Sequence, residues 1–173
     1  MLRFAVVKAL AAHGVPVALL ETEWRRPGVP DAVDLVVNTT PRVAVEFKYP
    51  REPRATNAPW TQHLGGMLRD FFRLAYMPAD FGDRWCVQLL SVRMQQYLTG
   101  VADRSSVRLA TTPGETSMLP MPAVRALPAT ATRPLARWLA TEESIVARCV
   151  QSYPVGDLSL IVHEVHPVTA MPD

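Results

Sequence analysis

The feature of the sequence that most constrains the fold is a pair of short apolar runs that carry charged residues inside them. Residues 29–52 read VPDAVDLVVNTTPRVAVEFKYPRE, with Asp34 in the first run and Glu46 and Lys48 in the second. Burying a charged group costs free energy unless the group is paired, hydrogen-bonded or bound to a metal. The two runs therefore predict neighbouring strands whose charged side chains meet in one site.

The direction of these three side chains follows from the two-residue period of a strand. Glu46 and Lys48 are two residues apart and project from one face, and the turn at NTTPR predicts a hairpin that brings Asp34 beside them. Two carboxylates held together raise each other's pKa unless a cation lies between them. A hard divalent ion such as Mg²⁺ accepts these oxygen ligands. A lysine beside it can orient water or stabilise developing negative charge.

The remaining patterns predict an α/β fold. Apolar residues at helical spacing or in alternation predict six elements in the first half of the chain. They are a helix over 2–13, strands over 15–24, 33–37 and 43–49, a helix over 60–77 and a strand over 84–92. Further along we expect a short helix over 93–98, a short strand over 106–111, a helical stretch over 133–150 and a closing strand over 157–168. Gly65 and Gly66 inside a helix reduce its stability and indicate close approach by another backbone.

Length and composition predict one domain over 1–173. Of the 173 residues, 49% are hydrophobic and 20% charged, which is typical of a globular chain. No apolar run reaches the roughly 18 residues of a membrane span, and no secretory cleavage site follows the first helix, so we expect a cytoplasmic protein. Cys86 and Cys149 lack zinc-site spacing and are predicted to be buried free thiols.

The net charge of +2 is too small for the whole chain to act as a polycation for nucleic acid. Any contact with DNA would therefore come from local basic patches. One candidate patch contains Lys48, Arg51 and Arg54, and another contains Arg25 and Arg26. Scattered solvated arginines are the alternative interpretation of both patches.

The charged strands also resemble a known motif. Pro30-Asp31 followed by Asp34, an eleven-residue gap and then Glu46-Phe47-Lys48 is similar to the PD-(D/E)xK nuclease superfamily, as is the order helix, three strands, helix, strand. The resemblance covers about residues 1–91. It implies a restriction endonuclease-like αβββαβ core with a mixed sheet flanked by helices, followed by a C-terminal α/β extension over about 92–173.

This resemblance implies a metal-dependent phosphodiesterase that cleaves DNA, in restriction, repair or phage defence. Asp34 and Glu46 would bind Mg²⁺, with Mn²⁺ as a substitute, and the Phe47 carbonyl would add a ligand. Lys48 would assist the attacking water. A helical glutamine that leans on the site occurs in some members of the superfamily, and Gln62 is similarly placed.

Many members of the superfamily carry a further acidic residue on the first helix, where this chain has none. Glu21 and Glu23 are the replacements that we consider, with Glu23 preferred because it lies nearer the turn into Asp34. An alternative for the hairpin is a surface ion pair between Asp34 and Lys48, with Glu46 facing water.

The other polar residues receive structural interpretations. His63, His163 and His166 are expected at surface or helix positions, and Asp70 and Arg73 as an ion pair along the second helix.

A catalytically inactive module that binds nucleic acid or protein is the second functional hypothesis, and the missing helix acid favours it. RNA stays open as the substrate. Sequence specificity would come from loops, from a homodimer or from a partner protein.

Overall fold

One mixed sheet of seven strands runs through the computed structural model, which describes residues 2–26, 31–50 and 60–168. The strands are β1 (Leu20–Arg25), β2 (Ala32–Val37), β3 (Arg42–Lys48), β4 (Phe81–Ser91), β5 (Thr116–Leu119), β6 (Ile145–Val155) and β7 (Leu158–Val165). They lie in the order β1-β2-β3-β4-β7-β6-β5. The β3–β4 pair is parallel and all other neighbouring pairs are antiparallel.

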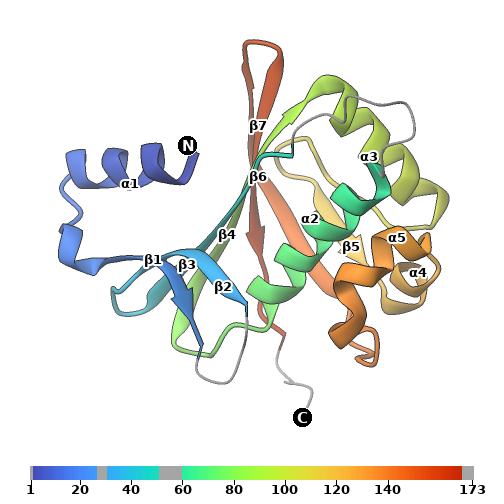
Figure 1. Cartoon of the computed structure of the whole chain (residues 1–173), viewed down its shortest axis with the longest axis horizontal. Helices are drawn as coiled ribbons and strands as arrows, with labels where there is room; N and C mark the ends of the chain where they lie inside the picture. Colours follow the sequence, from blue (N-terminus) through green and yellow to red (C-terminus); the bar gives the residue numbers. More distant parts are fainter. Residues whose placement is uncertain (1, 27–30, 51–59, 169–173) are drawn as a thin grey trace.

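Helices flank this sheet. They are α1 (Leu2–Ala12), α2 (Trp60–Ala75), α3 (Val92–Arg104), α4 (Met121–Arg125) and α5 (Ala129–Thr132), with 3-10 turns η1 (Val17–Leu19) and η2 (Arg133–Trp138). Figure 1 shows α2 to α5 gathered on one side of the molecule, whereas α1 lies apart, beyond β1. No helix in the described ranges is both long enough and apolar enough to cross a membrane.

The first half of the chain has the predicted order of elements. Strands β2 and β3 form the expected antiparallel hairpin, in which Val36 pairs with Ala44 and Val37 with Val43. Strand β1 begins later than predicted, because residues 17–19 form a 3-10 turn after Pro16. The bounds of α1 agree with the prediction, but none of its residues is buried.

The long helix α2 supplies much of the core. Its apolar stripe is buried as the periodicity predicts, with Leu64, Leu68 and Phe71 fully inaccessible. A Cβ placed on Gly65 would lie 2.2 Å from the carbonyl oxygen of Ala131 in α5, so a side chain there has no space. The expected close approach of another backbone is therefore confirmed at Gly65.

The second half differs from the predictions in two segments. We predicted helical structure over 133–150, yet η2 ends at Trp138 and strand β6 starts at Ile145. Alternate residues Ile145, Ala147 and Cys149 face the core, a two-residue period that outweighs the helical pattern. The strand expected over 106–111 is reduced to an isolated bridge at Arg108.

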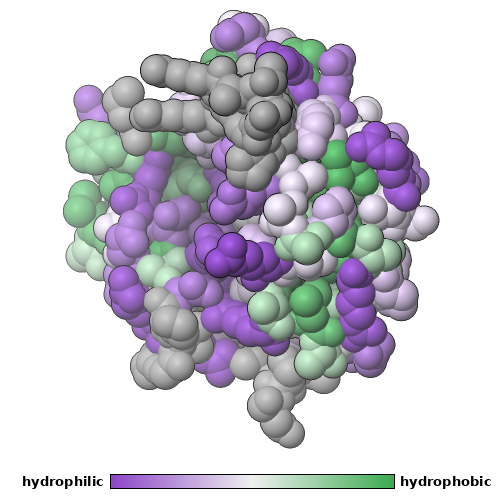
Figure 2. All heavy atoms as spheres, turned by 45° about the vertical axis from the view of Figure 1, so that its right-hand side comes forward, coloured by the Kyte–Doolittle hydropathy of each residue, from purple (hydrophilic) through white to green (hydrophobic). Residues whose placement is uncertain are grey.

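The surface is mixed in character. Figure 2 shows hydrophilic side chains gathered across the middle of one face, with hydrophobic side chains in separate groups toward its margins. Both cysteines are buried free thiols, as predicted.

Candidate functional site

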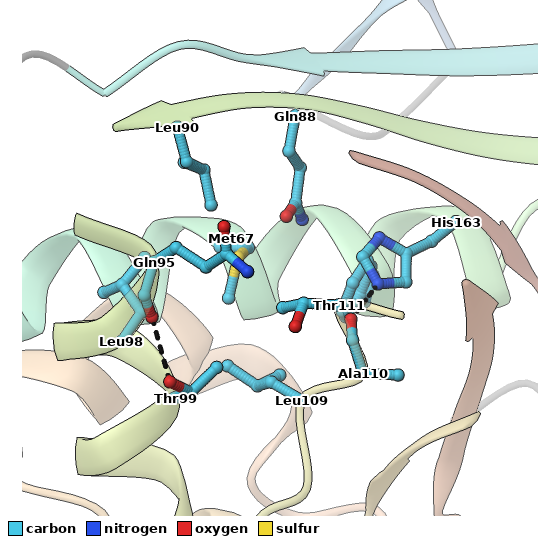
Figure 3. Close-up of a pocket in the computed structure, with 11 residues that line it drawn as sticks. Met67, Gln88, Leu90, Gln95, Leu98, Thr99, Leu109, Ala110, Thr111 and His163 are labelled. Carbon is cyan, nitrogen blue, oxygen red and sulfur yellow. Dashed lines mark hydrogen bonds between the residues drawn. The ribbon is translucent and has the colours of Figure 1, made fainter. Parts of the chain in front are cut away.

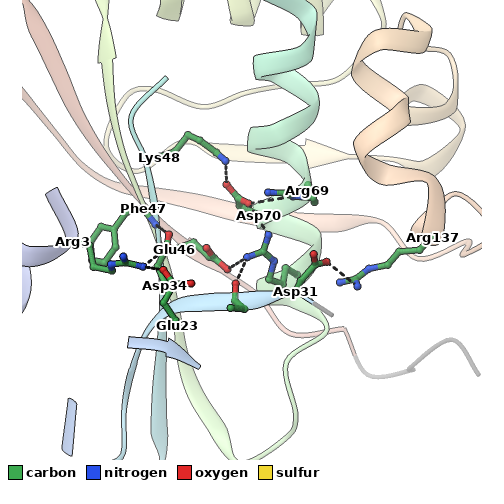
Figure 4. Close-up of polar contacts among 12 residues, drawn as sticks. Arg3, Glu23, Asp31, Asp34, Glu46, Phe47, Lys48, Arg69, Asp70 and Arg137 are labelled. Atoms are coloured by element: carbon green, nitrogen blue, oxygen red, sulfur yellow. Dashed lines mark hydrogen bonds and ion pairs between the residues drawn. The ribbon is translucent and has the colours of Figure 1, made fainter. Parts of the chain in front are cut away.

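A polar cleft of about 360 Å³ lies between α2 and the ends of β2 and β3. Asp34, Glu46 and Lys48, the charged strand residues singled out in the sequence, all line it. Charged side chains of α2 complete the wall: Arg69, Asp70 and Arg73. Figure 4 shows these groups converging from the two sides, so the hairpin and α2 together form the site.

Asp34 lies where β2 and β3 separate. The ladder between these strands ends at the pair Leu35 and Val45. Beyond this pair, the Asp34 carboxylate accepts a hydrogen bond of 2.8 Å from the backbone N–H of Phe47 on β3. This side-chain bond replaces a backbone hydrogen bond between the two strands. On its other side, Arg3 of α1 lies 3.4 Å from Asp34. The carboxylate is thus oriented by the neighbouring strand and remains partly exposed.

Glu46 is buried, with 2% of its surface exposed. Its carboxylate accepts a hydrogen bond of 2.6 Å from Arg73, which also donates to the Ala32 carbonyl at 2.5 Å. Burial raises the pKa of Glu46 well above its usual range, the charges of Asp70 and Asp34 raise it further, and Arg73 opposes them. Glu46 is therefore a carboxyl that gains from any additional cation in the cleft.

Lys48 pairs with Asp70 across the cleft. The Lys48 Nζ lies 2.6 Å from an oxygen of Asp70, a residue that is 2% exposed. Burial raises the pKa of Asp70, although Lys48, Arg73 and Arg69 each act against the rise. The alternative of a surface hairpin is wrong, because Glu46 is buried and the ion-pair partner of Lys48 is Asp70 and not Asp34.

The two candidate acids of β1 differ in position. Glu23 lines the cleft and forms an ion pair with Arg3 of α1. Its backbone φ of 56° is left-handed, a conformation that costs a residue other than glycine about 1 to 3 kcal/mol. Glu21 instead accepts a hydrogen bond from Asn38 and does not line the cleft. Of the two, Glu23 is therefore the one that the fold brings to the site.

The other predicted contributors are dispersed. Gln62 is exposed at the start of α2 and is not among the residues that line the cleft. Arg25 does line it. Pro30, Arg51 and Arg54 lie outside the described residues.

Sequence reasoning missed the part that α2 plays in the site. Asp70 and Arg73 do pair along the helix at 3.4 Å, as predicted, but both also contact the strand residues. The overlooked signal is the position of Asp70, three residues after Met67 and four before Leu74. A carboxylate on the buried apolar stripe of a helix requires a cationic partner from another element.

The donors in the cleft suit a hard divalent ion. Asp34, Glu46 and the Phe47 carbonyl offer oxygen ligands, and a bound cation would favour the charged form of Glu46, whose pKa is raised mainly by burial. Within the described residues, no three His, Cys, Asp or Glu side chains are grouped so as to hold a metal together. Mg²⁺ commonly takes only one or two carboxylates, with water and substrate phosphate completing its shell. The residues present therefore fit one such ion.

Met67 and Phe71 of α2 border a second cavity, and none of the described residues that line it is Asp, Glu, Lys or Arg. It measures about 10 Å³, near the least that holds one water molecule, and its described lining is mainly apolar (Figure 3). His163 borders it, 2% exposed, with its Nε2 2.8 Å from the Ala110 carbonyl oxygen. The prediction of a surface or helix position for His163 is wrong, because it is a buried residue of strand β7. This cavity is too small for a substrate.

Comparison of the chain with protein-family models, with curated proteins and with solved structures finds no match. The function of the cleft is therefore inferred from its own residues.

Proposed function

We propose that the protein is a metal-dependent phosphodiesterase that cleaves DNA and has the restriction endonuclease-like core of the PD-(D/E)xK superfamily. The observation that carries this proposal is the meeting of Asp34, Glu46 and Lys48 in one polar cleft, where β2 and β3 separate. The order α1, β1, β2, β3, α2, β4 supports the assignment to the superfamily. Restriction, repair and phage defence are all settings for such an enzyme.

The roles of the residues follow from their charges and contacts. A divalent ion, when bound, neutralises charge on a phosphate and lowers the pKa of water. Asp34 and Glu46 would hold it, with Asp34 oriented by the Phe47 N–H. Lys48, kept in place by Asp70 and 23% exposed, presents its ammonium to the cleft, where it stabilises negative charge on the reacting phosphate.

Degradation of labelled single-stranded and double-stranded DNA by the purified protein, with Mg²⁺, with Mn²⁺ and with EDTA, tests the proposal. We expect metal-dependent cleavage that falls at least about 100-fold in Asp34→Ala and in Lys48→Ala, because each removes charge that the transition state requires. Glu164→Gln is the matched control, since Glu164 pairs with Arg148 on a strand outside the cleft.

Binding of Mn²⁺, followed by its paramagnetic relaxation of water protons, provides a readout that does not depend on cleavage. We expect Asp34→Ala to weaken Mn²⁺ binding and Lys48→Ala to leave it intact. Wild-type protein that neither binds Mn²⁺ nor cleaves DNA or RNA would refute the proposal.

A nuclease-fold module that binds nucleic acid or protein without cleavage is the second candidate. The observation that favours it is the pairing of the acids with cations of the chain itself, Glu46 with Arg73 and Asp34 with Arg3. These pairs compensate the carboxylates in the absence of a metal. DNA binding that persists in EDTA, together with no cleavage under any metal, would favour this candidate.

A further inference from the structure

The α2 wall of the cleft carries more basic than acidic side chains. Three cations surround the single carboxylate of Asp70, with Lys48 at 2.6 Å, Arg73 at 3.4 Å and Arg69 at 3.8 Å. The only other described acid in ion-pair contact with them is Glu46, which pairs with Arg73. Three positive groups therefore share two carboxyl groups, which leaves an excess of positive charge.

Arg69 is the least compensated of the three. Its described ion-pair partner is Asp70, at the longest of the three distances, and its side chain lines the cleft and is 37% exposed. Its Nε is buried and has no hydrogen-bond acceptor within the described part of the chain. Because Nε is buried, the exposed remainder of the guanidinium is the part that can donate to an anionic ligand in the cleft.

A further guanidinium lies near this wall. Arg137 of η2 pairs with Asp31 at 2.9 Å, and Asp31 itself lines the cleft. Burial lowers the pKa of Arg137, Asp31 acts to raise it, and the positive charges of Arg73 and Arg69 lower it further. The positive charges of Arg73 and Arg69 thus act on Arg137, and an anion bound near them would offset that repulsion.

The opposite side of the cleft has the reverse character. There Asp34 and Glu23 both pair with Arg3 of α1 (Figure 4), and Arg25 of β1 also lines this side. Carboxylates therefore outnumber cations among the lining residues next to β1 and β2, and guanidinium groups outnumber carboxylates among those on α2. A phosphodiester with a metal on one side and guanidinium groups on the other matches this division, because both groups neutralise the same anionic oxygens.

We propose that Arg69, positioned by Asp70 beside Lys48, binds a backbone phosphate of the nucleic-acid strand in the cleft. Arginine suits this role because its planar fork donates two parallel hydrogen bonds to phosphate oxygens. The inference rests on the proposed function for its choice of a nucleic-acid ligand. It adds a binding residue on α2 to the proposed site and places one phosphate of the nucleic acid at the α2 wall.

Binding measured in EDTA tests this role separately from cleavage. The probes are labelled single-stranded and double-stranded DNA, titrated with wild type, Arg69→Ala, Arg69→Lys and the control Arg108→Ala, at several salt concentrations. Arg108 is a matched control because it is exposed and pairs with Glu115 outside the cleft. We expect Arg69→Ala to bind DNA about tenfold more weakly. The salt slope, that is, the slope of the logarithm of the binding constant against the logarithm of the salt concentration, should be smaller in magnitude by about 1. Arg69→Lys should recover the salt slope and part of the affinity.

The outcomes separate this inference from the proposed function. Binding that depends on Arg69 in a protein that never cleaves DNA would refute the nuclease and leave the phosphate site standing. Equal affinity and equal salt slope in wild type and Arg69→Ala would overturn the phosphate site. Inorganic phosphate is a further probe. Displacement of bound DNA by phosphate would support the phosphate site. If the wild-type protein binds phosphate but no DNA, the assignment of this site to nucleic acid is overturned.

Discussion

The buried carboxyl groups of the cleft, Glu46 and Asp70, each pair with a cation from another element. Glu46 on β3 depends on Arg73, and Lys48 depends on Asp70, both from α2. Removing one partner of such a pair leaves an uncompensated charge, which typically costs about 3 to 5 kcal/mol. The stability of the cleft and its chemistry therefore depend on the same side chains.

His163 is a buried residue that should make stability depend on pH. Burial lowers its pKa, which the hydrogen bond to Ala110 only partly offsets. As the pH falls through about 6.5, the unfolded chain takes up a proton at this ring while the folded protein does not. We expect this residue to reduce the free energy of unfolding below that pH, by at most about 1.4 kcal/mol per pH unit, and to have no such effect above it.

Urea unfolding of wild type and His163→Gln between about pH 5 and 7.5 measures this contribution. The difference in slope between the two proteins isolates the ring, because the other titrating groups are common to both. His166→Gln is the control, since His166 is exposed at the end of β7. Parallel curves for wild type and His163→Gln would contradict the expectation.

At the scale of elements, α2 connects the core to the cleft. One side of it packs on α5, where Gly65 has no space for a Cβ, and the adjacent Gly66 faces Lys48. A Cβ on Gly66 would lie 3.7 Å from the Lys48 Nζ, which is ordinary van der Waals contact. The two glycines are therefore neighbours in sequence with different structural requirements.

This difference predicts opposite effects of the same substitution. Gly65→Ala should lower the free energy of unfolding by about 1 to 3 kcal/mol, because the methyl group collides with the backbone of Ala131. Gly66→Ala should raise it by up to about 1 kcal/mol through better helix propensity. Chemical denaturation of both variants measures the effects. Equal stability of the two variants would show that α5 does not restrict α2 as described.

The C-terminal strands show why some elements could not be predicted locally. Residues 145–150 contain both a helical and an alternating pattern of apolar residues. Pairing with β7 on one side and β5 on the other decides between them, because a strand there satisfies two ladders. Nothing within the segment itself specifies those neighbours.

At the scale of the whole molecule, the two halves of the chain share one sheet. β4, which ends the predicted nuclease core, pairs with β7 from Trp85↔Glu164 to Ser91↔Leu158. Helix α2 packs against α5 and η2 of the second half. The segment that we expected to be an extension is therefore part of the same layers as the site.

This architecture predicts that a fragment of residues 1–91 does not fold alone. It would expose the edge of β4 and the apolar face of α2 that the second half covers. Amide dispersion in NMR and the urea unfolding transition of the fragment, compared with those of the full chain, measure this. A cooperative transition in the fragment would contradict the expectation.

The sequence by itself determined the strand hairpin and the set Asp34, Glu46 and Lys48, because a two-residue period and the cost of burying charge act locally. It also determined α2, whose stripe has a helical period. Only the tertiary structure decided which cations neutralise these acids, which β1 carboxylate lines the cleft and which neighbours make 145–155 a strand. Those outcomes depend on contacts between segments far apart in the chain, and no local period encodes them.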